Sequence, residues 1–298
     1  MKTNALTRRE FLVRSAALAG AAWATPSLVH AAAEKRTATD IVTLGKTGIK
    51  LSRLGIGTGS NSGNIQFALG KENFIKLVHY AYDKGIRYFD CAKNYKTFEW
   101  IGDAIKDLPR DKIFILSKIG GNPEKPEEVI DMHLKNYKTD YVDAMLVHCA
   151  TKDSWTDDVK RLMDSIAEAQ QKGKIRAKGV SCHSLPALRV AAKSDWVDMN
   201  LVRVNPQAKH TDGETPKWDG PSAGIEPVVE QLKIMDEKGH GIIGMKLIGD
   251  GDFKDPADRE KSIRYAMSRP ELDAVVIGCK SEAEIDEAIE RINNALAG

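Results

Sequence analysis

The sequence has little of what defines several protein classes. Only four of its 298 residues are cysteine, too few for a disulfide-stabilised scaffold of this length. Aromatic residues make up 6%, and 44 basic residues nearly balance 42 acidic ones, giving a formal net charge of +2. So small a net charge does not favour a nucleic acid or an acidic membrane surface as a partner. The 42% hydrophobic content is typical of a globular enzyme with one large domain or two medium ones.

The apolar run near the N-terminus, residues 16–24, is shorter than the roughly 20 residues that a membrane-spanning helix needs, so we expect no stable membrane anchor. This segment resembles an export signal of the twin-arginine class. Arg8 and Arg9 precede Phe11 and Leu12, and the small residues of 29–33 provide a cleavage site. We therefore expect residues 1–33 to be a signal peptide read by the twin-arginine export machinery. An amphipathic helix kept on the mature protein is the alternative.

Residues 34–298 are expected to form a single domain in the periplasm. Residues 1–33 hold four basic residues and one acidic residue, so the domain itself is close to neutral. We expect it to be a monomer.

Short apolar segments alternate with longer amphipathic ones from residue 53 onward. Before them, apolar segments at 41–44 and 49–51 flank the turn-forming sequence Gly-Lys-Thr-Gly, which predicts a β-hairpin. The predicted strands cover residues 54–57, 87–89, 112–116, 142–147, 175–180, 200–204, 241–245 and 274–277. The predicted helices cover residues 71–84, 96–107, 126–137, 157–172, 184–194, 224–238, 256–268 and 281–296.

Eight strands, each followed by a helix, predict an α/β fold, because every parallel connection needs a crossover. The count of eight and the length of the domain match a (β/α)₈ TIM barrel, typically about 250 residues, here with an N-terminal β-hairpin. The main rival is a doubly wound open sheet with a Gly-rich phosphate turn after its first strand. Gly55, Gly57 and Gly59 are followed by the polar segment 60–63, which is unsuited to opening a helix, so we discard this rival.

Four polar residues follow predicted strands, where barrel active sites lie. Asp90 ends the second strand, with Tyr95 five residues later in the loop, Lys118 ends the third, and His148 ends the fourth. Each alone has a structural explanation, such as helix capping, a rim charge or packing. Together they suggest catalysis, because a buried Lys needs an Asp partner and would favour the phenolate of a nearby Tyr. We therefore expect a lowered pKa at Tyr95, general acid catalysis toward a carbonyl oxygen, and a His that orients the substrate.

The motif Asp90-x-Ala92-x-x-Tyr95, with Lys118 after an apolar strand and the sequence DYVDAMLVH ending at His148, resembles the aldo-keto reductases. This family consists of nicotinamide-dependent (β/α)₈ oxidoreductases, and the resemblance covers about residues 41–296. It implies that Tyr95 is the proton donor, that Lys118 and Asp90 tune it, and that His148 positions a substrate carbonyl.

The resemblance also implies a cofactor extended across the barrel mouth. The implied cofactor-binding residues are Gly57, Thr58, Ser181, Cys182, Arg203, Met245, Lys246, Leu247, Gly249, Lys280, Ser281 and Glu284. Four of them depart from the family pattern: Cys182 replaces an Asn, Arg203 a Gln, Met245 an aromatic residue that stacks on the nicotinamide, and Glu284 an Arg.

The form of the cofactor stays open between NADP and NAD. The family resemblance favours NADP, but Glu284 stands where an Arg usually grips the 2′-phosphate, and a carboxylate there repels a phosphate. The sequence Ser281-x-x-Glu284 also matches a helix capping box.

Cysteines 91, 149, 182 and 279 each directly follow a residue at the end of a strand, but their spacing matches no zinc or iron–sulfur pattern, so no metal site is expected. Cys149 and Cys182 follow adjacent strands, so the alternative to four free thiols is a disulfide between these two in an oxidising periplasm.

The leading hypothesis is an exported oxidoreductase acting on a small carbonyl compound, a sugar or the corresponding alcohol, with its cofactor bound before export. One alternative is a periplasmic barrel that only binds a sugar or another small ligand. Another is a barrel enzyme of different chemistry, although the sequence lacks the clustered acid pair of a hydrolase. We expect selectivity to reside in the loop 210–223, preceded by Lys209 and containing His210 and Trp218. Trp218 is either a stacking platform for a sugar or a contact within a lid.

Overall fold

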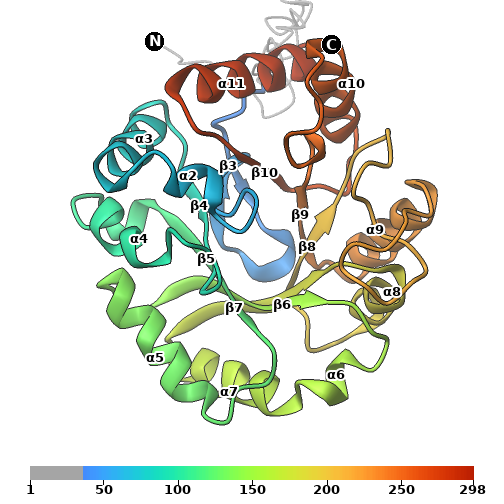
Figure 1. Cartoon of the computed structure of the whole chain (residues 1–298). Helices are drawn as coiled ribbons and strands as arrows, with labels where there is room; N and C mark the ends of the chain where they lie inside the picture. Colours follow the sequence, from blue (N-terminus) through green and yellow to red (C-terminus); the bar gives the residue numbers. More distant parts are fainter. Residues whose placement is uncertain (1–35) are drawn as a thin grey trace, which may run out of the picture. The chain divides into compact units, whose positions relative to one another are not determined.

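The computed structural model describes residues 36–298; the predicted signal peptide lies outside them. Eight strands form a closed barrel in which each strand pairs in parallel with the next and the last closes on the first (Figure 1). They are β3 (Leu54–Gly57), β4 (Tyr88–Asp90), β5 (Phe114–Gly120), β6 (Val142–Ala150), β7 (Ile175–Cys182), β8 (Met199–Arg203), β9 (Gly241–Met245) and β10 (Ala274–Gly278). The predicted (β/α)₈ barrel is confirmed.

The helices form an outer ring around the strands (Figure 1). They are α2 (Asn64–Phe67), α3 (Lys71–Asp83), α4 (Phe98–Ile105), α5 (Pro126–Tyr137), α6 (Trp155–Asp158), α7 (Lys160–Gln171), α8 (Leu185–Lys193), α9 (Glu226–Lys238), α10 (Pro256–Met267) and α11 (Glu282–Leu296). The one-turn helices α2 and α6 were not predicted, because four residues are too few to show a helical period. None of the helices within residues 36–298 combines the length and apolarity needed to cross a membrane.

Strands β5 and β6 extend further than the sequence pattern predicts. The pairing of these strands continues through Lys118 with Leu146 and Gly120 with His148. Lys118 and His148 therefore lie inside the strands, beyond the predicted limits at residues 116 and 147. Apolarity alone placed the strand ends too early, because the strands continue through polar residues that face the mouth.

The predicted hairpin is present as a separate two-stranded sheet, β1 (Ile41–Thr43) and β2 (Lys50–Ser52), joined by a short 3₁₀ helix, η1 (Gly45–Thr47). Its apolar side chains Leu44, Ile49 and Leu51 are buried in the same cluster as the barrel interior. The backbone N–H of Gly45 donates to the Asp273 carboxylate (3.0 Å), which also accepts from Ile242 N–H (2.9 Å). The hairpin thus closes the end of the barrel at which the strands begin.

Alternate residues of each strand face the barrel interior, as the two-residue period of a strand requires. The interior cluster contains Tyr88, Phe114, Leu116, Leu146 and Leu201, among others, whereas the intervening residues join a larger cluster with the helices. Gly55 makes room for Tyr88, since a Cβ at position 55 would lie 1.9 Å from the Tyr88 ring.

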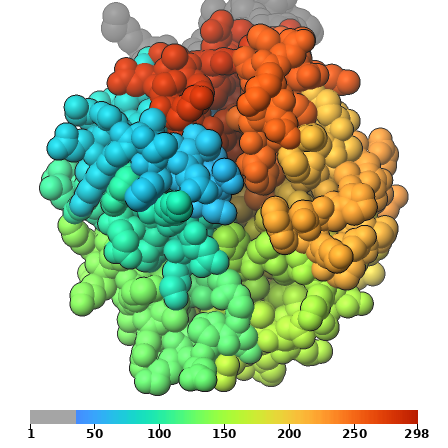
Figure 2. Space-filling model, viewed as in Figure 1, coloured from blue at the N-terminus to red at the C-terminus, as the bar shows by residue number. Residues whose placement is uncertain are grey.

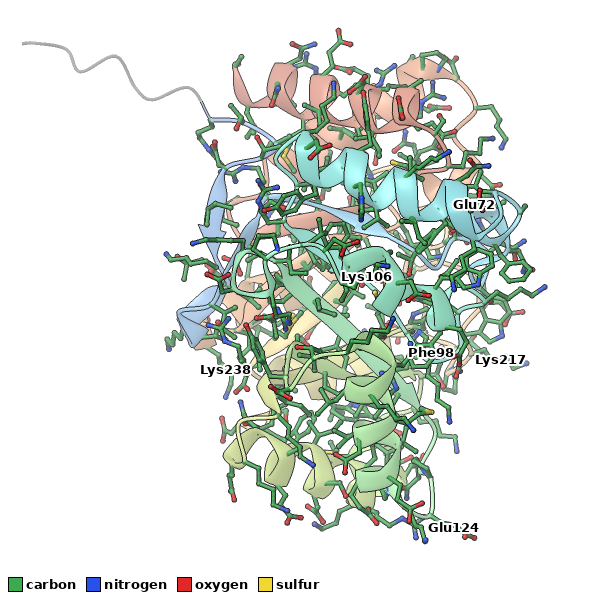
Figure 3. The ribbon with its side chains drawn as sticks, turned by 90° about the vertical axis from the view of Figure 1, so that its left-hand side faces the viewer. Glu72, Phe98, Lys106, Glu124, Lys217 and Lys238 are labelled. Atoms are coloured by element: carbon green, nitrogen blue, oxygen red, sulfur yellow. The ribbon has the colours of Figure 1, made fainter. Side chains whose placement is uncertain are left out.

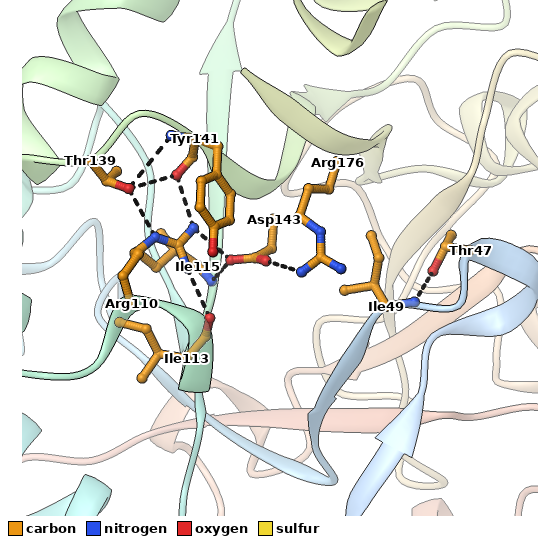
Figure 4. A network of polar contacts seen from close by, with 9 residues as sticks. All are labelled: Thr47, Ile49, Arg110, Ile113, Ile115, Thr139, Tyr141, Asp143 and Arg176. Atoms are coloured by element: carbon orange, nitrogen blue, oxygen red, sulfur yellow. Dashed lines mark hydrogen bonds and ion pairs between the residues drawn. The ribbon is translucent and has the colours of Figure 1, made fainter. Parts of the chain in front are cut away.

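A buried carboxylate near the start of β6 joins three segments of the barrel wall (Figure 4). Asp143, 1% exposed, accepts hydrogen bonds from Arg110 (2.7 Å), Arg176 (2.8 Å) and the backbone N–H of Ile115 (2.9 Å). These donors compensate for the loss of hydration that burial imposes on the carboxylate. The network lies away from the mouth and stabilises the fold.

Candidate active site

The carboxyl ends of the strands form a ring of inward-facing residues. Because side chains alternate along a strand, the residues two positions beyond the interior residues Tyr88, Leu116, Leu146 and Leu201 also face inward. These are Asp90, Lys118, His148 and Arg203. Ser181 and Met245 occupy the equivalent positions on β7 and β9, and the glycines Gly57 and Gly278 pair on β3 and β10.

Figure 2 shows the molecule from the side on which α2 lies in front. This face is hollowed near its centre, between the early segments in blue and cyan and the late segments in orange. In the side view, Glu72, Glu124 and Lys217 lie toward one end of the barrel and Lys238 toward the hairpin at the other (Figure 3). The candidate site therefore lies at the end away from the hairpin, on the loops that follow the strands.

Lys118 is the centre of a buried polar cluster. Its ammonium donates to the Asp90 carboxylate (2.6 Å), to the backbone carbonyl of Cys91 (2.9 Å) and to the Tyr95 hydroxyl (3.2 Å). Lys118 is 1% exposed and Asp90 4% exposed. The three contacts use all three donor hydrogens of the ammonium, so its orientation is fixed.

Tyr95 lies in the loop between β4 and α4, and the backbone holds its ring in place. Its N–H donates to the carbonyl of Ala92 (3.1 Å). A Cβ at position 59 would lie 2.2 Å from the Tyr95 ring, so only glycine lets the loop after β3 come this close. Sequence reasoning named Gly59 only as part of a weak glycine motif and missed this contact.

The pKa of Tyr95 is not lowered, which corrects the expectation from the sequence. Burial raises the pKa of Tyr95 to about 12, although the nearby Lys118 ammonium opposes the shift. The sequence-based expectation considered only the Lys118 ammonium, which lowers the pKa of Tyr95. Desolvation and the Asp90 carboxylate both raise it. Burial also raises the pKa of Asp90, although the Lys118 ammonium opposes the shift. Burial acts to lower the pKa of Lys118, but Asp90 and Tyr95 outweigh it, and the pKa of Lys118 is raised.

His148 presents its ring edge-on to Tyr95, with ring centroids 5.7 Å apart and an interplanar angle of 82°. Burial, together with Lys118, lowers the pKa of His148 to about 3. The imidazole is therefore neutral at physiological pH and can donate one hydrogen bond and accept another. The structure thus brings Asp90, Tyr95, Lys118 and His148 together at one site.

Arg203 forms a buried ion pair that the sequence did not reveal. Its guanidinium contacts one oxygen of Asp212 through Nε (2.8 Å) and Nη2, and its Nη1 donates to the carbonyl of Trp218 (3.0 Å). Asp212 is fully buried, and burial raises its pKa to about 6 against the effect of Arg203. The loop 210–223 is therefore fixed beside the mouth, with the Trp218 side chain 64% exposed. Asp212 had no sequence signal, since it lies in a polar loop.

The family model described as the aldo/keto reductase family matches residues 53–262, more than half of the chain. The chain belongs to the aldo/keto reductase family.

Curated proteins with similar sequences include aldo-keto reductase YhdN of Bacillus subtilis, 29% identical over 164 residues (49% of this chain, 48% of the relative). Another is glycerol 2-dehydrogenase (NADP(+)) of Hypocrea jecorina, 28% identical over 173 residues (48% of this chain, 52% of the relative). The matches span about half the length of these relatives. The holo form of an aldo-keto reductase from Bacillus halodurans has the same fold, with a TM-score of 0.68, 16% identity and coverage of 87% of this chain and 95% of that one.

Not all residues that the aldo/keto reductase resemblance assigns to the cofactor face the mouth. Cys182 and Leu247 are buried in the outer cluster between the barrel and the helices. A Cβ at position 249 would lie 3.0 Å from the Phe253 ring. Lys246 is close enough to the mouth for its charge to act on Asp90, and it pairs with Asp250 (2.8 Å). The Thr58 hydroxyl donates a hydrogen bond to the backbone carbonyl of Asp90 (2.9 Å), and this bond holds β3 against β4. Ser181 and Met245 remain in the inner ring.

The carboxylate of Glu284 lies at the N-terminus of α11 in this aldo/keto reductase. The Ser281 hydroxyl accepts from the N–H of Glu284 (3.2 Å), and the Glu284 carboxylate accepts from the N–H of Lys280 (2.8 Å). The Lys280 ammonium also lies 3.8 Å from that carboxylate. These bonds are close to the reciprocal pattern of a capping box, and the carboxylate occupies the end of the helix dipole that favours anions.

All four cysteines are free thiols, so the structure contains no bond between Cys149 and Cys182. Cys182 points away from the mouth, and Cys149 has a positive φ of 61°.

Proposed function

We propose that the protein is an oxidoreductase that interconverts a small carbonyl compound and its alcohol with a nicotinamide cofactor. The single observation that carries the proposal is the Lys118 ammonium, which lies 2.6 Å from Asp90 and 3.2 Å from the Tyr95 hydroxyl at the mouth of the barrel. Membership of the aldo/keto reductase family supports it.

The residues at the mouth fit the nicotinamide end of such a cofactor. Gly57 and Gly278 are neighbours in β3 and β10 and place no side chains over the inner ring. The inward-facing hydroxyl of Ser181 can both donate to and accept from a carboxamide, and the thioether of Met245 can pack on an aromatic face. When bound, the reduced nicotinamide supplies the hydride that adds to the carbonyl carbon.

Tyr95 donates its hydroxyl proton to the carbonyl oxygen as that oxygen gains charge. Its raised pKa keeps the proton on Tyr95 across physiological pH, the state that a general acid requires. The Lys118 ammonium, held by Asp90, then stabilises the tyrosinate that forms. In alcohol oxidation the same tyrosinate accepts the proton. Neutral His148, beside Tyr95, donates to the carbonyl oxygen and orients it.

NAD(H) is the proposed form of the cofactor, in place of the NADP that the family resemblance favours. Glu284 folds back onto the N-terminus of α11 and supplies a negative charge where a 2′-phosphate would need positive charge. Lys280, the nearby cation, already lies close to that carboxylate.

The periplasm remains the proposed location, supported by Arg8, Arg9 and the Ala-rich segment that follows them. Export by the twin-arginine machinery would carry the folded domain with its cofactor bound. Protein purified from the envelope and dialysed should then retain nicotinamide; a dialysed protein without it would count against this part of the proposal.

A sugar-binding barrel without catalysis is the second candidate. This candidate is favoured by Arg203, because its guanidinium already donates hydrogen bonds to the Asp212 carboxylate and the Trp218 carbonyl and does not point to a cofactor. Fluorescence titration with NADH and NADPH, followed by an assay of carbonyl reduction, separates the two. The oxidoreductase binds a reduced cofactor and oxidises it with a small aldehyde, whereas the binding barrel does neither.

A further inference from the structure

We propose that Tyr88 is a positioning residue for the reaction, because its hydroxyl holds the second oxygen of the Asp90 carboxylate and thereby fixes the pair of Asp90 with Lys118. This inference rests on the proposed function. To the four polar residues at the mouth it adds one that lies deeper, in the barrel interior.

Tyr88 lies in β4, two residues before Asp90, and both side chains face the barrel interior. Tyr88 is fully buried. Its N–H donates to the Ser52 hydroxyl (3.2 Å), and its ring packs edge-on against Phe114, with ring centroids 5.2 Å apart. The ring fills the space that Gly55 leaves open. These contacts fix the ring, so its hydroxyl is held at Asp90.

The two oxygens of the Asp90 carboxylate have one partner each within residues 36–298. Oδ1 accepts from the Lys118 ammonium (2.6 Å), and Oδ2 accepts from the Tyr88 hydroxyl (3.3 Å). In the same part of the chain, the Tyr88 hydroxyl has no other partner. A hydroxyl in an apolar interior is unfavourable unless it forms a hydrogen bond, so packing alone does not account for this oxygen.

The bond from Tyr88 favours the charged form of Asp90. Burial raises the pKa of Asp90, and the Lys118 ammonium and the Tyr88 hydroxyl oppose that shift. Tyr88 keeps its own proton, because burial raises its pKa well above the usual range. The ionised Asp90 directs the ammonium to the Tyr95 hydroxyl, where it stabilises the tyrosinate that forms during reduction. Without the Tyr88 hydroxyl, one oxygen of a buried carboxylate loses its partner, and the ammonium is held less firmly.

A role of Tyr88 in packing alone makes a different prediction. Loss of the hydroxyl would then change stability and leave the turnover of the folded protein as it was. A hydroxyl that acts through Asp90 lowers turnover, and its loss has no further effect once the carboxylate is gone. This non-additivity distinguishes the two roles.

The test measures reduction of propionaldehyde by the full chain, together with the Kd of the reduced cofactor. Tyr88→Phe should lower kcat about 10-fold and leave KM and the Kd within about 2-fold. In the Asp90→Asn background, the same substitution should change kcat by less than about 2-fold. Tyr88→Met, which also fills space without a donor, replaces the Phe variant if that variant does not fold.

Tyr137→Phe is the matched control. Tyr137 is also a buried tyrosine, and its hydroxyl contacts the Ser117 hydroxyl (2.7 Å) instead of a residue of the mouth. Its substitution removes one buried hydroxyl in the same way, and kcat should stay within about 2-fold of the wild type.

A kcat of Tyr88→Phe close to that of the wild type, or an equal loss with and without the Asp90 carboxylate, would overturn the role of Tyr88. An effect confined to KM or to the Kd of the cofactor would overturn it as well. If the wild type binds the cofactor and turns over no aldehyde, the proposed function fails, and this inference fails with it. The two failures are distinguishable, because the first leaves turnover by the wild type intact.

Discussion

The Lys118 ammonium lies 3.2 Å from the Tyr95 hydroxyl, and this contact joins two segments that are 23 residues apart in the sequence. A proton leaving Tyr95 creates a phenolate beside a fixed cation. The cation needs no reorientation during the reaction, because Asp90 and the carbonyl of Cys91 already hold it.

Gly59→Ala should displace Tyr95, because the added Cβ would lie 2.2 Å from its ring. Misplacement of a catalytic group by about 1 Å costs about 100-fold in rate. We expect kcat for carbonyl reduction to fall about 10-fold to 100-fold while the thermal midpoint changes little. Steady-state kinetics with thermal unfolding as the control checks this; an unchanged kcat would contradict the close packing of Gly59 on Tyr95.

Glu284→Arg should reverse the proposed preference for NADH. The substitution removes the carboxylate from the N-terminus of α11 and provides a cation for the 2′-phosphate. We expect the affinity for NADPH to rise about 10-fold, measured by fluorescence titration. Glu282→Arg makes the same change of charge in the same helical turn and is the control, with little expected effect. Tight NADPH binding by the wild type would contradict the role of Glu284.

Asp143→Ala should destabilise the barrel, because it leaves the N–H of Ile115 buried without an acceptor and two arginines without their partner. Removal of one member of a buried ion pair costs about 3–5 kcal/mol. Urea unfolding should show a loss in the free energy of unfolding of about that size. Asp164→Ala breaks the exposed pair of Asp164 with Lys160 and should change the stability little. Equal effects of the two substitutions would refute the structural role of Asp143.

Asp273 should make stability depend on pH in the acid range. Burial raises the pKa of Asp273 to about 6 in the folded protein, above about 3.9 in an unfolded chain. The folded state therefore binds more protons between these values, so this group's contribution to stability is largest below about pH 4 and is lost as the pH rises to about 6.

Comparison with Asp273→Asn isolates this group. The free energy of unfolding of the wild type, relative to the variant, should fall by up to about 2 kcal/mol from pH 4 to pH 6.5. Urea unfolding at several pH values measures the difference. A wild type that gains on the variant over this range would show that the pKa of Asp273 is lowered instead.

The sequence predicted the architecture well, because the periods of strands and helices reflect burial, and burial is what a barrel imposes on each element. It also predicted which side chains of β4, β5 and β6 share the mouth, since parallel strands bring their carboxyl ends together. It ended these two strands at residues 116 and 147, because Lys118 and His148 interrupt the apolar pattern, although pairing of β5 with β6 continues through them.

Contacts that depend on loop conformation were beyond the sequence. The pairing of Arg203 with Asp212 and the packing of Gly59 on Tyr95 both require knowledge of where a loop folds back. The sign of the Tyr95 pKa shift was wrong for a related reason, because the depth of burial is a property of the folded chain.

Reduction of a small aldehyde by the wild type and by Tyr95→Phe, each with its Kd for the reduced cofactor, tests the central claim most directly. Loss of the hydroxyl removes the proton donor but leaves the ring, so kcat should fall at least about 100-fold while the Kd is unchanged. Turnover by Tyr95→Phe at a rate close to that of the wild type would contradict the assignment of Tyr95 as the proton donor.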